Sequence, residues 1–352
     1  MRQMEVILNI EKTFLSNIPD CYAVANIPLP DKNYVLFASE GDDICLAYSL
    51  TNLSDSFTVW EHPGGTMGMV PIPNKPGEFL AVQKYYRLWD WEEAKLVWVQ
   101  IDKNKNAKVT DLITLPYIHR FDLLERNGEV YLLACSIATH KPTLKDWPEP
   151  GIVYSAKLPD SPDIPLKLEV LRDDFYKNHG YARVNKDGQD IGFVTCDNGG
   201  FLFTPPADEN SSWMIEKIID GNFSEGDMID IDGDGEQEIA LISPFHGSNF
   251  EIYKMIEGAY RKVYEFPEPA DFFHVAHAGY INKKPIFLGG GRGGEEKLFY
   301  VSYDSDTKEF ITTVIDSGQG PSNACIVNYP DYDYVFAANR NTGQAYAYKI
   351  NQ

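Results

Sequence analysis

The chain has 352 residues and a formal net charge of −21, from 52 acidic and 31 basic side chains. Such a surface repels phosphate backbones and anionic lipids, which excludes nucleic-acid and membrane binding as expected functions. Hydrophobic residues make up 43% of the chain and aromatic residues 13%, enough to build a sizeable core and to exclude general disorder.

The beginning of the chain and the cysteines indicate a cytoplasmic protein. The first residues, MRQMEVILNIEKTFL, lack the apolar segment and small-residue cleavage pattern of a signal peptide, and no apolar run of roughly 18 residues suggests a membrane span. The five cysteines are odd in number, scattered and without a CxxC pair: Cys21, Cys45, Cys135, Cys196 and Cys325. We therefore expect reduced, mostly buried thiols.

A strongly apolar run recurs seven times along the chain, each time after a shorter strand and a polar turn. The seven runs are Tyr34–Ala38, Phe79–Val82, Val130–Ala134, Ile191–Val194, Ile239–Ile242, Pro285–Leu288 and Tyr334–Ala337. The strands that precede them are predicted to start near Ala23, Met67, His119, His179, Asp227, His274 and Asn323. The runs start about 45 to 60 residues apart, the spacing of four-stranded propeller blades.

This repeat predicts an all-β chain that forms a single seven-bladed β-propeller domain over residues 1–352. The last unit has only three strands, while the strand-like run Met4–Ile10 belongs to no unit. Pairing that run with the last unit would close the ring and remove an exposed edge. A pair of β-sandwiches and a six-bladed ring are the alternatives.

The turn of the fifth unit carries a candidate calcium loop. Asp230, Asp232, Asp234 and Glu238 occupy positions 1, 3, 5 and 9 of a turn that contains Gly233 and Gly235. Alternate carboxylates in a tight turn converge on one point, and hard oxygen ligands suit Ca²⁺. We expect a structural ion there; a turn without metal is the alternative.

Six of the seven histidines fall at two equivalent places in the repeat. Four lie at the start of a first strand and two just past the end of a second strand: His119, His179, His274 and His277, then His140 and His246. Because these strands are antiparallel, both places lie at one mouth of the ring. Lys84, Tyr86, Tyr181, Arg183, Asn249 and Arg292 map to the same mouth. This predicts a site for an anionic or polyhydroxylated ligand. A transition metal held by several of the histidines is an open alternative.

These motifs resemble those of propeller polysaccharide lyases, the ulvan lyases and rhamnose–glucuronate lyases. The resemblance is carried by His119-Arg-Phe-Asp, Ala-Thr-His140 and His179-Gly-Tyr181, in that order. The Asp230 loop and Phe245–Tyr253 are also similar to segments of aldos-2-ulose dehydratases and FG-GAP propellers. The lyases carry an arginine on the strand after the tyrosine, where this chain has Asp197-Asn198. A keto-sugar is therefore an alternative to a uronate as the substrate.

The resemblance implies a carbohydrate lyase or dehydratase that works by β-elimination. His119 and Tyr181 would form the acid–base pair, and His140 would orient or neutralise the acidic group. Substrate-binding residues would be His179, Arg183, His246, Asn249, Arg292, Lys84 and Tyr86. Two alternatives remain: a non-catalytic propeller that binds sugar or protein, and a metal-dependent hydrolase or isomerase that uses the histidine cluster. The sequence does not predict the oligomeric state.

Overall fold

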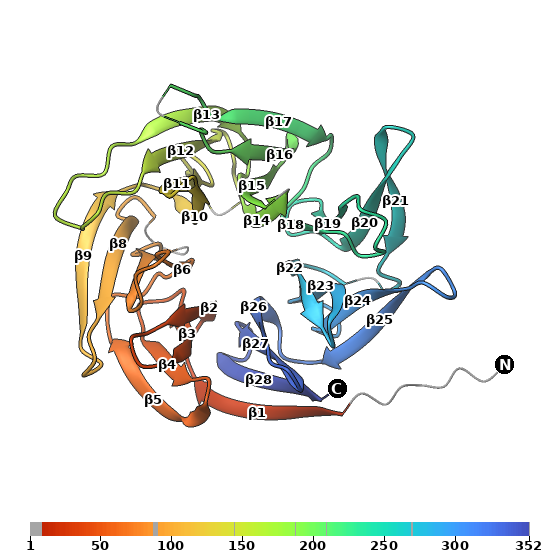
Figure 1. Cartoon of the computed structure of the whole chain (residues 1–352), viewed down its shortest axis with the longest axis horizontal. Helices are drawn as coiled ribbons and strands as arrows, with labels where there is room; N and C mark the ends of the chain where they lie inside the picture. Colours follow the sequence, from red (N-terminus) through yellow and green to blue (C-terminus); the bar gives the residue numbers. More distant parts are fainter. Residues whose placement is uncertain are drawn as a thin grey trace.

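Seven β-sheets surround a central axis (Figure 1). The structure, a computed structural model, describes residues 9–86, 91–143, 145–186, 188–208, 210–268 and 270–351. Each sheet has four antiparallel strands and forms one blade. None of the described segments is a helix with the length and apolar character needed to cross a membrane. The described chain is therefore the all-β, seven-bladed propeller that the repeat predicts.

The strands occupy the same four positions in every blade. The innermost strands, which face the axis, are β2 (Cys21–Pro28), β6 (Met69–Pro71), β10 (Ile118–Arg126), β14 (Gly180–Lys186), β18 (Gly226–Ile229), β22 (Phe273–Ile281) and β26 (Pro321–Asn328). The second strands are β3 (Asn33–Ser39), β7 (Glu78–Gln83), β11 (Glu129–Ser136), β15 (Gln189–Cys196), β19 (Glu238–Ser243), β23 (Lys284–Gly291) and β27 (Tyr332–Asn339). The third strands are β4 (Cys45–Ser49), β8 (Lys95–Ile101), β12 (Gly151–Lys157), β16 (Gly199–Thr204), β20 (Asn249–Ile256), β24 (Leu298–Asp304) and β28 (Gln344–Asn351). The outer strands are β5 (Asn52–Trp60), β9 (Ala107–Thr114), β13 (Glu169–Phe175), β17 (Met214–Ile219), β21 (Ala259–Glu265), β25 (Glu309–Asp316) and β1 (Ile10–Asn17).

The second strands are the apolar runs of the sequence repeat, and all seven predicted runs lie within them. They are apolar without alternation because each sheet packs between two neighbours, which buries both of its faces. In β3, for example, Val35, Leu36 and Phe37 are all fully buried. The outer strands have solvent on one side, so β1 is mostly exposed or half-buried.

Seven hydrophobic clusters fill the boundaries between neighbouring blades. Six clusters draw their buried residues from two adjacent sheets each, and the seventh adds Tyr22 of blade one to residues of blades two and three. Together they continue around the whole ring. Phe250 of blade five packs against Phe299 of blade six, with 5.2 Å between ring centroids. Phe336 of blade seven packs against Phe37 of blade one at 6.4 Å. The core is thus a closed ring of interfaces, and burial of this apolar area is its main stabilising contribution.

The ring closes through blade seven, where β1 pairs with β28 from Ile10↔Ile350 to Asn17↔Gln344. This confirms the predicted closure by a strand from the beginning of the chain. The predicted run, Met4–Ile10, overlaps this strand at Ile10, and the carbonyl oxygen of Asn9 accepts a hydrogen bond from the backbone N–H of Asn351. The predicted end of the strand was wrong, because the pairing continues to Asn17. Residues 1–8 lie outside the described part of the chain. An outer strand needs no apolar run, so the part of β1 beyond Ile10 gave no apolar signal in the sequence.

Candidate functional site

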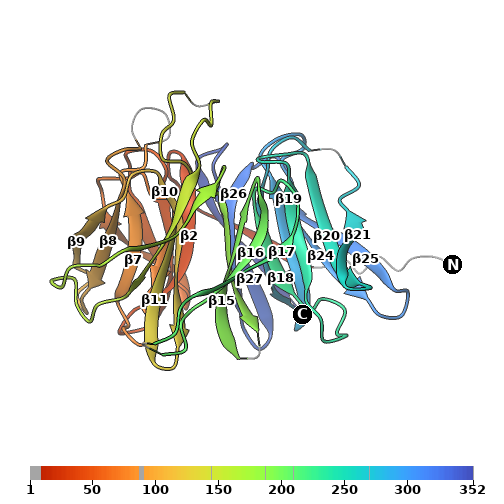
Figure 2. The same ribbon diagram turned by 90° about the horizontal axis from the view of Figure 1, so that it is seen from above.

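One cavity at a mouth of the ring gathers most of the histidines. Its volume is about 190 Å³, and it is lined by Tyr22, Glu40, Met67, Tyr85, His119, Ile137, Lys141, Trp147, His179, Phe245, His246, His274 and Arg292. These residues come from the starts of innermost strands and from the segments that follow second strands. The segment between β11 and β12, which supplies Lys141 and Trp147, rises above the ring in the side view (Figure 2).

β-Bulges place several of these side chains. In β2, β10, β22 and β26 the pairing register shifts at the second residue, which is Tyr22, His119, His274 and Ser322 respectively. A bulge inserts one extra residue and re-aims its side chain, and bulges often lie next to active sites. Three of these four residues line the cavity, and the carbonyl group of Ser322 contacts His274. The repeated bulge therefore turns equivalent residues of different blades toward one space.

His179 is placed by the glycine that follows it. A Cβ atom on Gly180 would collide with the Thr195 hydroxyl and the Ser224 carbonyl oxygen. Only glycine therefore lets β14 approach blade five this closely. His179 Nδ1 consequently lies 2.8 Å from Oε1 of Glu225. The same oxygen forms an ion pair with the guanidinium group of Arg120, at 2.7 Å.

Four imidazole rings lie side by side in the cavity. The ring centroids of His119 and His179 are 4.3 Å apart, and those of His179 and His246 are 4.6 Å apart. The Nε2 atoms of His179 and His246 face each other at 3.1 Å. His274 Nδ1 contacts the Ser322 carbonyl oxygen at 2.6 Å, while its Nε2 lies 3.3 Å from the Tyr22 hydroxyl.

Burial and neighbouring positive charge lower the pKa of three of these rings, His119, His179 and His274. Burial, with the charges of His179 and Arg120 added, holds the pKa of His119 well below its usual range. The same causes lower the pKa of His274, and burial lowers that of His179 in spite of Glu225. The Nδ1 atom of His119 is buried and has no hydrogen-bond partner. A neutral imidazole with an unused ring nitrogen can accept a proton or bind a ligand.

The polar groups around the histidines include an acid and two cations. Burial raises the pKa of Tyr22 to about 12, so its hydroxyl keeps its proton near neutral pH. The Lys141 ammonium lies 3.5 Å from the centroid of the Trp147 ring, and the Arg292 guanidinium lies 4.5 Å from that of Phe272. Burial alone would raise the pKa of Glu225, but the charges of Arg120 and His179 outweigh it and lower that pKa. These groups give the cavity a positive side within an acidic protein.

The sequence-predicted residues divide into two groups. Five of them line the cavity: His119, His179, His246, His274 and Arg292. His277 does not, and its Nδ1 lies 3.1 Å from Asp227 instead. His140 lies four residues beyond β11, at the same mouth, but its side chain is exposed and does not line the cavity. Tyr181 does not line it either, because its ring packs in the cluster between blades three and four, where its hydroxyl is buried without a partner. The expectation that His119, His140 and Tyr181 share one pocket is therefore wrong for the last two.

The other predicted substrate-binding residues also lie outside the cavity lining. Arg183 forms a two-pronged ion pair with Asp122 of the neighbouring blade. Tyr86 donates a hydrogen bond to Asp42, and Lys84 pairs with Glu93. Asn249 contacts the Ser243 hydroxyl at 3.5 Å. Their actual partners are thus neighbouring protein groups.

Four residues of the site were missed from the sequence: Tyr22, Glu40, Lys141 and Glu225. Tyr22 is one of 21 tyrosines and stands in an ordinary apolar strand, so only its bulge distinguishes it. Glu225 precedes β18 and carries no motif. Its position directly before an innermost strand, equivalent to that of His179, was the one available signal.

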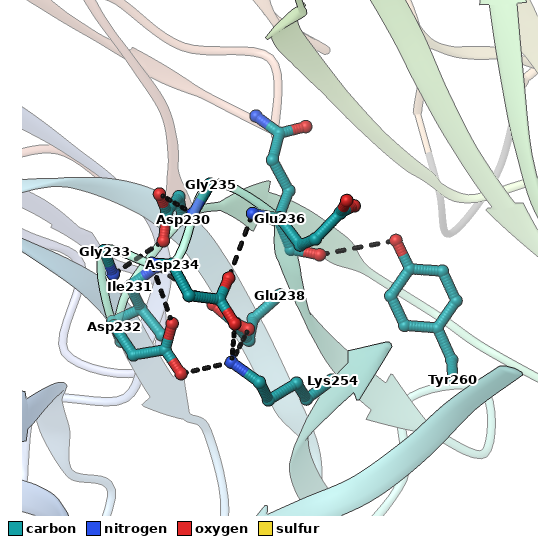
Figure 3. A network of polar contacts seen from close by, with 11 residues as sticks. Asp230, Ile231, Asp232, Gly233, Asp234, Gly235, Glu236, Glu238, Lys254 and Tyr260 are labelled. Atoms are coloured by element: carbon teal, nitrogen blue, oxygen red, sulfur yellow. Dashed lines mark hydrogen bonds and ion pairs between the residues drawn. The ribbon is translucent and has the colours of Figure 1, made fainter. Parts of the chain in front are cut away.

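The acidic loop between β18 and β19 has an internal cation (Figure 3). Ligand oxygens of Asp230, Asp232 and Asp234 lie within 4.8 Å of one another. The Lys254 ammonium contacts Asp232 and lies 2.7 Å from Asp234 and 3.1 Å from Glu238. Asp230 instead accepts hydrogen bonds from the backbone N–H groups of Gly233 and Gly235. The carboxylates converge as predicted, and the single ammonium group of Lys254 pairs with three of them.

All five cysteines are free thiols. Four are buried and Cys325 is half-buried, as the sequence indicated. Burial raises the pKa of Cys135 and of Cys196 to about 12, which leaves both thiols protonated and unreactive. None of the five lines the cavity.

Comparison with known proteins shows the fold. No family model matches the sequence, and no curated protein matches it. Among solved structures, virginiamycin B lyase from Staphylococcus aureus matches with a TM-score of 0.59 and 12% identity, over 98% of this chain and 99% of that one. A streptogramin B lyase matches with a TM-score of 0.60 and 11% identity, over 98% of both chains. A putative 6-phosphogluconolactonase from Bacteroides uniformis matches at 0.53 and 13%, over 93% of this chain and 94% of that one. At such identities, function must be argued from the cavity.

Proposed function

We propose that the chain is a carbon–oxygen lyase that acts by β-elimination on a hydroxyl-rich substrate, either an anionic uronate-containing oligosaccharide or a neutral keto-sugar. The observation that carries the proposal is the composition of one cavity. A buried imidazole with an unused nitrogen, His119, lines the same space as a protonated phenol, Tyr22, and two cations, Lys141 and Arg292. Elimination needs a base, an acid and a positive charge, and all three are present.

The reaction can be written with these groups. His119 removes the proton on the carbon next to a carboxylate or ketone, and the electron pair left behind forms the new carbon–carbon double bond. The carbon–oxygen bond at the β position breaks, and the leaving oxygen takes a proton from Tyr22. Water returns the proton to Tyr22 and receives that of His119. No oxidant or reductant is required, since the substrate loses only an alcohol or water.

The charges of the site favour an anionic substrate. A chain with net charge −21 repels anions in general, so cations collected at one cavity must offset that repulsion locally. Arg292 can hold a carboxylate through two parallel hydrogen bonds, and Lys141 adds a second positive charge. The negative charge that develops during proton removal would be stabilised by the same groups.

The size of the cavity limits the reacting part of the substrate. A volume of about 190 Å³ is slightly larger than the roughly 150 Å³ cavity that accepts a benzene-sized molecule. One six-membered sugar ring therefore fits, and the rest of an oligosaccharide would lie outside. Trp147 and Phe245 in the cavity wall offer flat apolar surfaces for the faces of such a ring.

The proposal is tested by incubating the protein with short uronate-containing oligosaccharides and with keto-sugars. Elimination creates a double bond conjugated to a carbonyl group, which absorbs in the ultraviolet. We expect this absorbance to rise with the wild-type protein and to rise roughly 10²–10⁴-fold more slowly with His119→Ala. His62→Ala, an exposed histidine outside the cavity, is the matched control. Binding of the sugars without any absorbance change would support a non-catalytic propeller instead.

A metal-dependent hydrolase or isomerase is the second candidate. It is favoured by ring nitrogens of His179, His246 and His274, which lie within 4.8 Å of one another. Such an enzyme would convert a lactone or sugar without forming a conjugated alkene, and chelator would stop it. Product analysis by mass and absorbance separates the two candidates, because hydrolysis adds water and elimination does not.

A further inference from the structure

Three histidines from three different blades bring their ring nitrogens together. His179 precedes β14 of blade four, His246 follows β19 of blade five, and His274 lies in β22 of blade six. One nitrogen from each ring lies within 4.8 Å of the other two. The residues are 28 to 95 positions apart in the sequence, so the closed ring rather than a local motif creates the group.

The first ring, His179, is oriented by a carboxylate. Its Nδ1 lies 2.8 Å from Glu225, and an ionised carboxylate only accepts hydrogen bonds. The two atoms are not aligned for a hydrogen bond, but the negative charge of Glu225 favours the proton on Nδ1 and the lone pair of the ring on Nε2, toward His246. Arg120 pairs with the same carboxylate at 2.7 Å and keeps it ionised. A carboxylate behind a histidine is the usual outer partner of a metal-binding imidazole.

The second ring, His274, is oriented by a backbone carbonyl. Its Nδ1 lies 2.6 Å from the carbonyl oxygen of Ser322, which can only accept. The lone pair is again on Nε2, where the Tyr22 hydroxyl lies at 3.3 Å. A carbonyl group is the other common outer partner of a metal-binding histidine.

The third ring, His246, is held by aromatic contacts and by an unusual backbone. It stacks on Phe245 with 4.0 Å between centroids and meets Phe272 edge-on at 4.4 Å. Its φ angle of 48° lies in the left-handed region, which non-glycine residues seldom adopt and which is concentrated at functional sites. Its Nε2 is thereby fixed 3.1 Å from that of His179.

We propose that His179, His246 and His274 form a binding site for a divalent transition metal ion such as Zn²⁺, with its remaining position open to the cavity. Three nitrogen ligands favour such an ion over Ca²⁺ or Mg²⁺, which prefer oxygen. Three protein ligands with one open position are typical of catalytic rather than structural zinc sites. Glu225, Arg120 and Ser322 act as positioning residues. The site goes beyond the proposed elimination and stands on its own geometry, because His119, the proposed base, is not one of its ligands.

The test measures metal binding directly. The protein is stripped with chelator, dialysed and titrated with Co²⁺, a probe whose visible spectrum reports the number and geometry of its ligands, and the heat of binding is recorded in parallel. We expect one Co²⁺ per chain with an intense tetrahedral or five-coordinate spectrum, displaced by one equivalent of Zn²⁺.

Variants decide which residues bind the ion. His246→Ala should abolish the spectrum while the fold persists, since His246 lies in a connecting segment and is half-buried. Glu225→Gln should weaken binding by roughly 10–100-fold, as loss of an outer partner does. His62→Ala, whose side chain is 66% exposed and outside the group, should bind like the wild type. Circular dichroism and a melting curve confirm that each variant is folded.

Two results would overturn the proposal: absence of Co²⁺ binding by the folded wild type, or equal binding by the wild type and His246→Ala. Neither depends on activity. If Co²⁺ binds as expected but no sugar is eliminated, the metal site stands and the proposed function fails. If stripped protein eliminates at the full rate and binds no Co²⁺, the function stands and the metal site fails.

Discussion

The hydroxyl group of Tyr22 lies 3.3 Å from Nε2 of His274, although the two residues are 252 positions apart. Tyr22 belongs to blade one and His274 to blade six, and blade seven lies between them. The two side chains meet because both are bulge residues at the start of innermost strands. The bond thus crosses the mouth of the ring and places a phenol among the histidines.

This relationship makes Tyr22, rather than Tyr181, the expected proton donor. Tyr22→Phe removes only the hydroxyl and should lower kcat by roughly 10²–10⁴-fold, the usual cost of losing a positioned acid. Tyr181→Phe, the matched variant at the tyrosine of the lyase-like motif, should keep most of the activity, because its hydroxyl does not line the cavity. Steady-state kinetics on the same substrate compare the two. A large loss in Tyr181→Phe with little loss in Tyr22→Phe would reverse the assignment.

We expect Arg292 to contribute to substrate binding and Arg183 to contribute to the stability of the fold. Arg292→Ala should raise KM for an anionic substrate by at least about tenfold and leave the melting temperature nearly unchanged, since the Arg292 side chain lines the cavity. Arg183→Ala should leave KM unchanged and lower stability by roughly 1.5–3 kcal/mol, because Asp122 would lose its charged partner. Kinetics and denaturant unfolding measure both effects. An increased KM in Arg183→Ala would show that Arg183 does bind the substrate, as the sequence predicted.

We propose that the acidic loop binds Ca²⁺ in competition with Lys254. In Lys254→Met the carboxylates of Asp232, Asp234 and Glu238 lose their ammonium partner, which should lower stability by roughly 1–3 kcal/mol in the presence of chelator. Ca²⁺ at about 100 times its dissociation constant should then restore about 2.7 kcal/mol. Thermal melting with and without Ca²⁺ measures the difference.

The first control changes a lysine of β21, the strand that pairs with β20, where Lys254 lies. Lys262→Met removes a lysine that pairs with Glu251 and Glu265, away from the loop, and should show no Ca²⁺ dependence. Adding Asp232→Ala to Lys254→Met should remove the response to Ca²⁺. If Lys254→Met melts at the same temperature in Ca²⁺ and in chelator, the loop is a turn without a metal site.

Closure by β1 should contribute strongly to stability. Deleting residues 1–17 removes every pair between β1 and β28 and exposes the edge of β28, so we expect a loss on the order of 3 kcal/mol or more. At roughly 2–4 °C per kcal/mol, the melting temperature should fall by about 10 °C. Phe14→Ser, which changes an exposed side chain of the same strand and keeps the pairing, is the control. A deletion that melts like the wild type would show that blade seven is stable with three strands.

The sequence was sufficient for the fold because the second strands are buried on both faces. That burial requires continuous apolar runs, and seven such runs with regular spacing allow few other architectures. The mouth of the ring could be predicted as well, since antiparallel pairing fixes which strand ends lie together. This rule alone located five residues of the cavity: His119, His179, His246, His274 and Arg292.

The direction of individual side chains could not be predicted, because it depends on β-bulges, and no particular residue type marks these bulges in the sequence. His119 and Tyr181 are both the second residue of an innermost strand, but β10 has a bulge at His119 and β14 pairs without one at Tyr181. One extra residue reverses which face a side chain occupies. Tyr22 was not predicted as a site residue for the same reason. Lys254 was missed for another reason, since it reaches the acidic loop across the sheet from β20.

The pairing of β1 with β28 has a consequence for synthesis of the protein. The ribosome makes β1 before the other strands of the ring and its partner β28 after them, so β1 must wait tens of seconds for its partner at roughly 5–20 residues per second. During that time the first six blades can form in order, but the first of them lacks its neighbour in blade seven. The cavity shares this delay, because the Ser322 carbonyl that orients His274 belongs to blade seven. A nascent chain therefore remains an open arc until blade seven has been made, and the complete cavity forms only then.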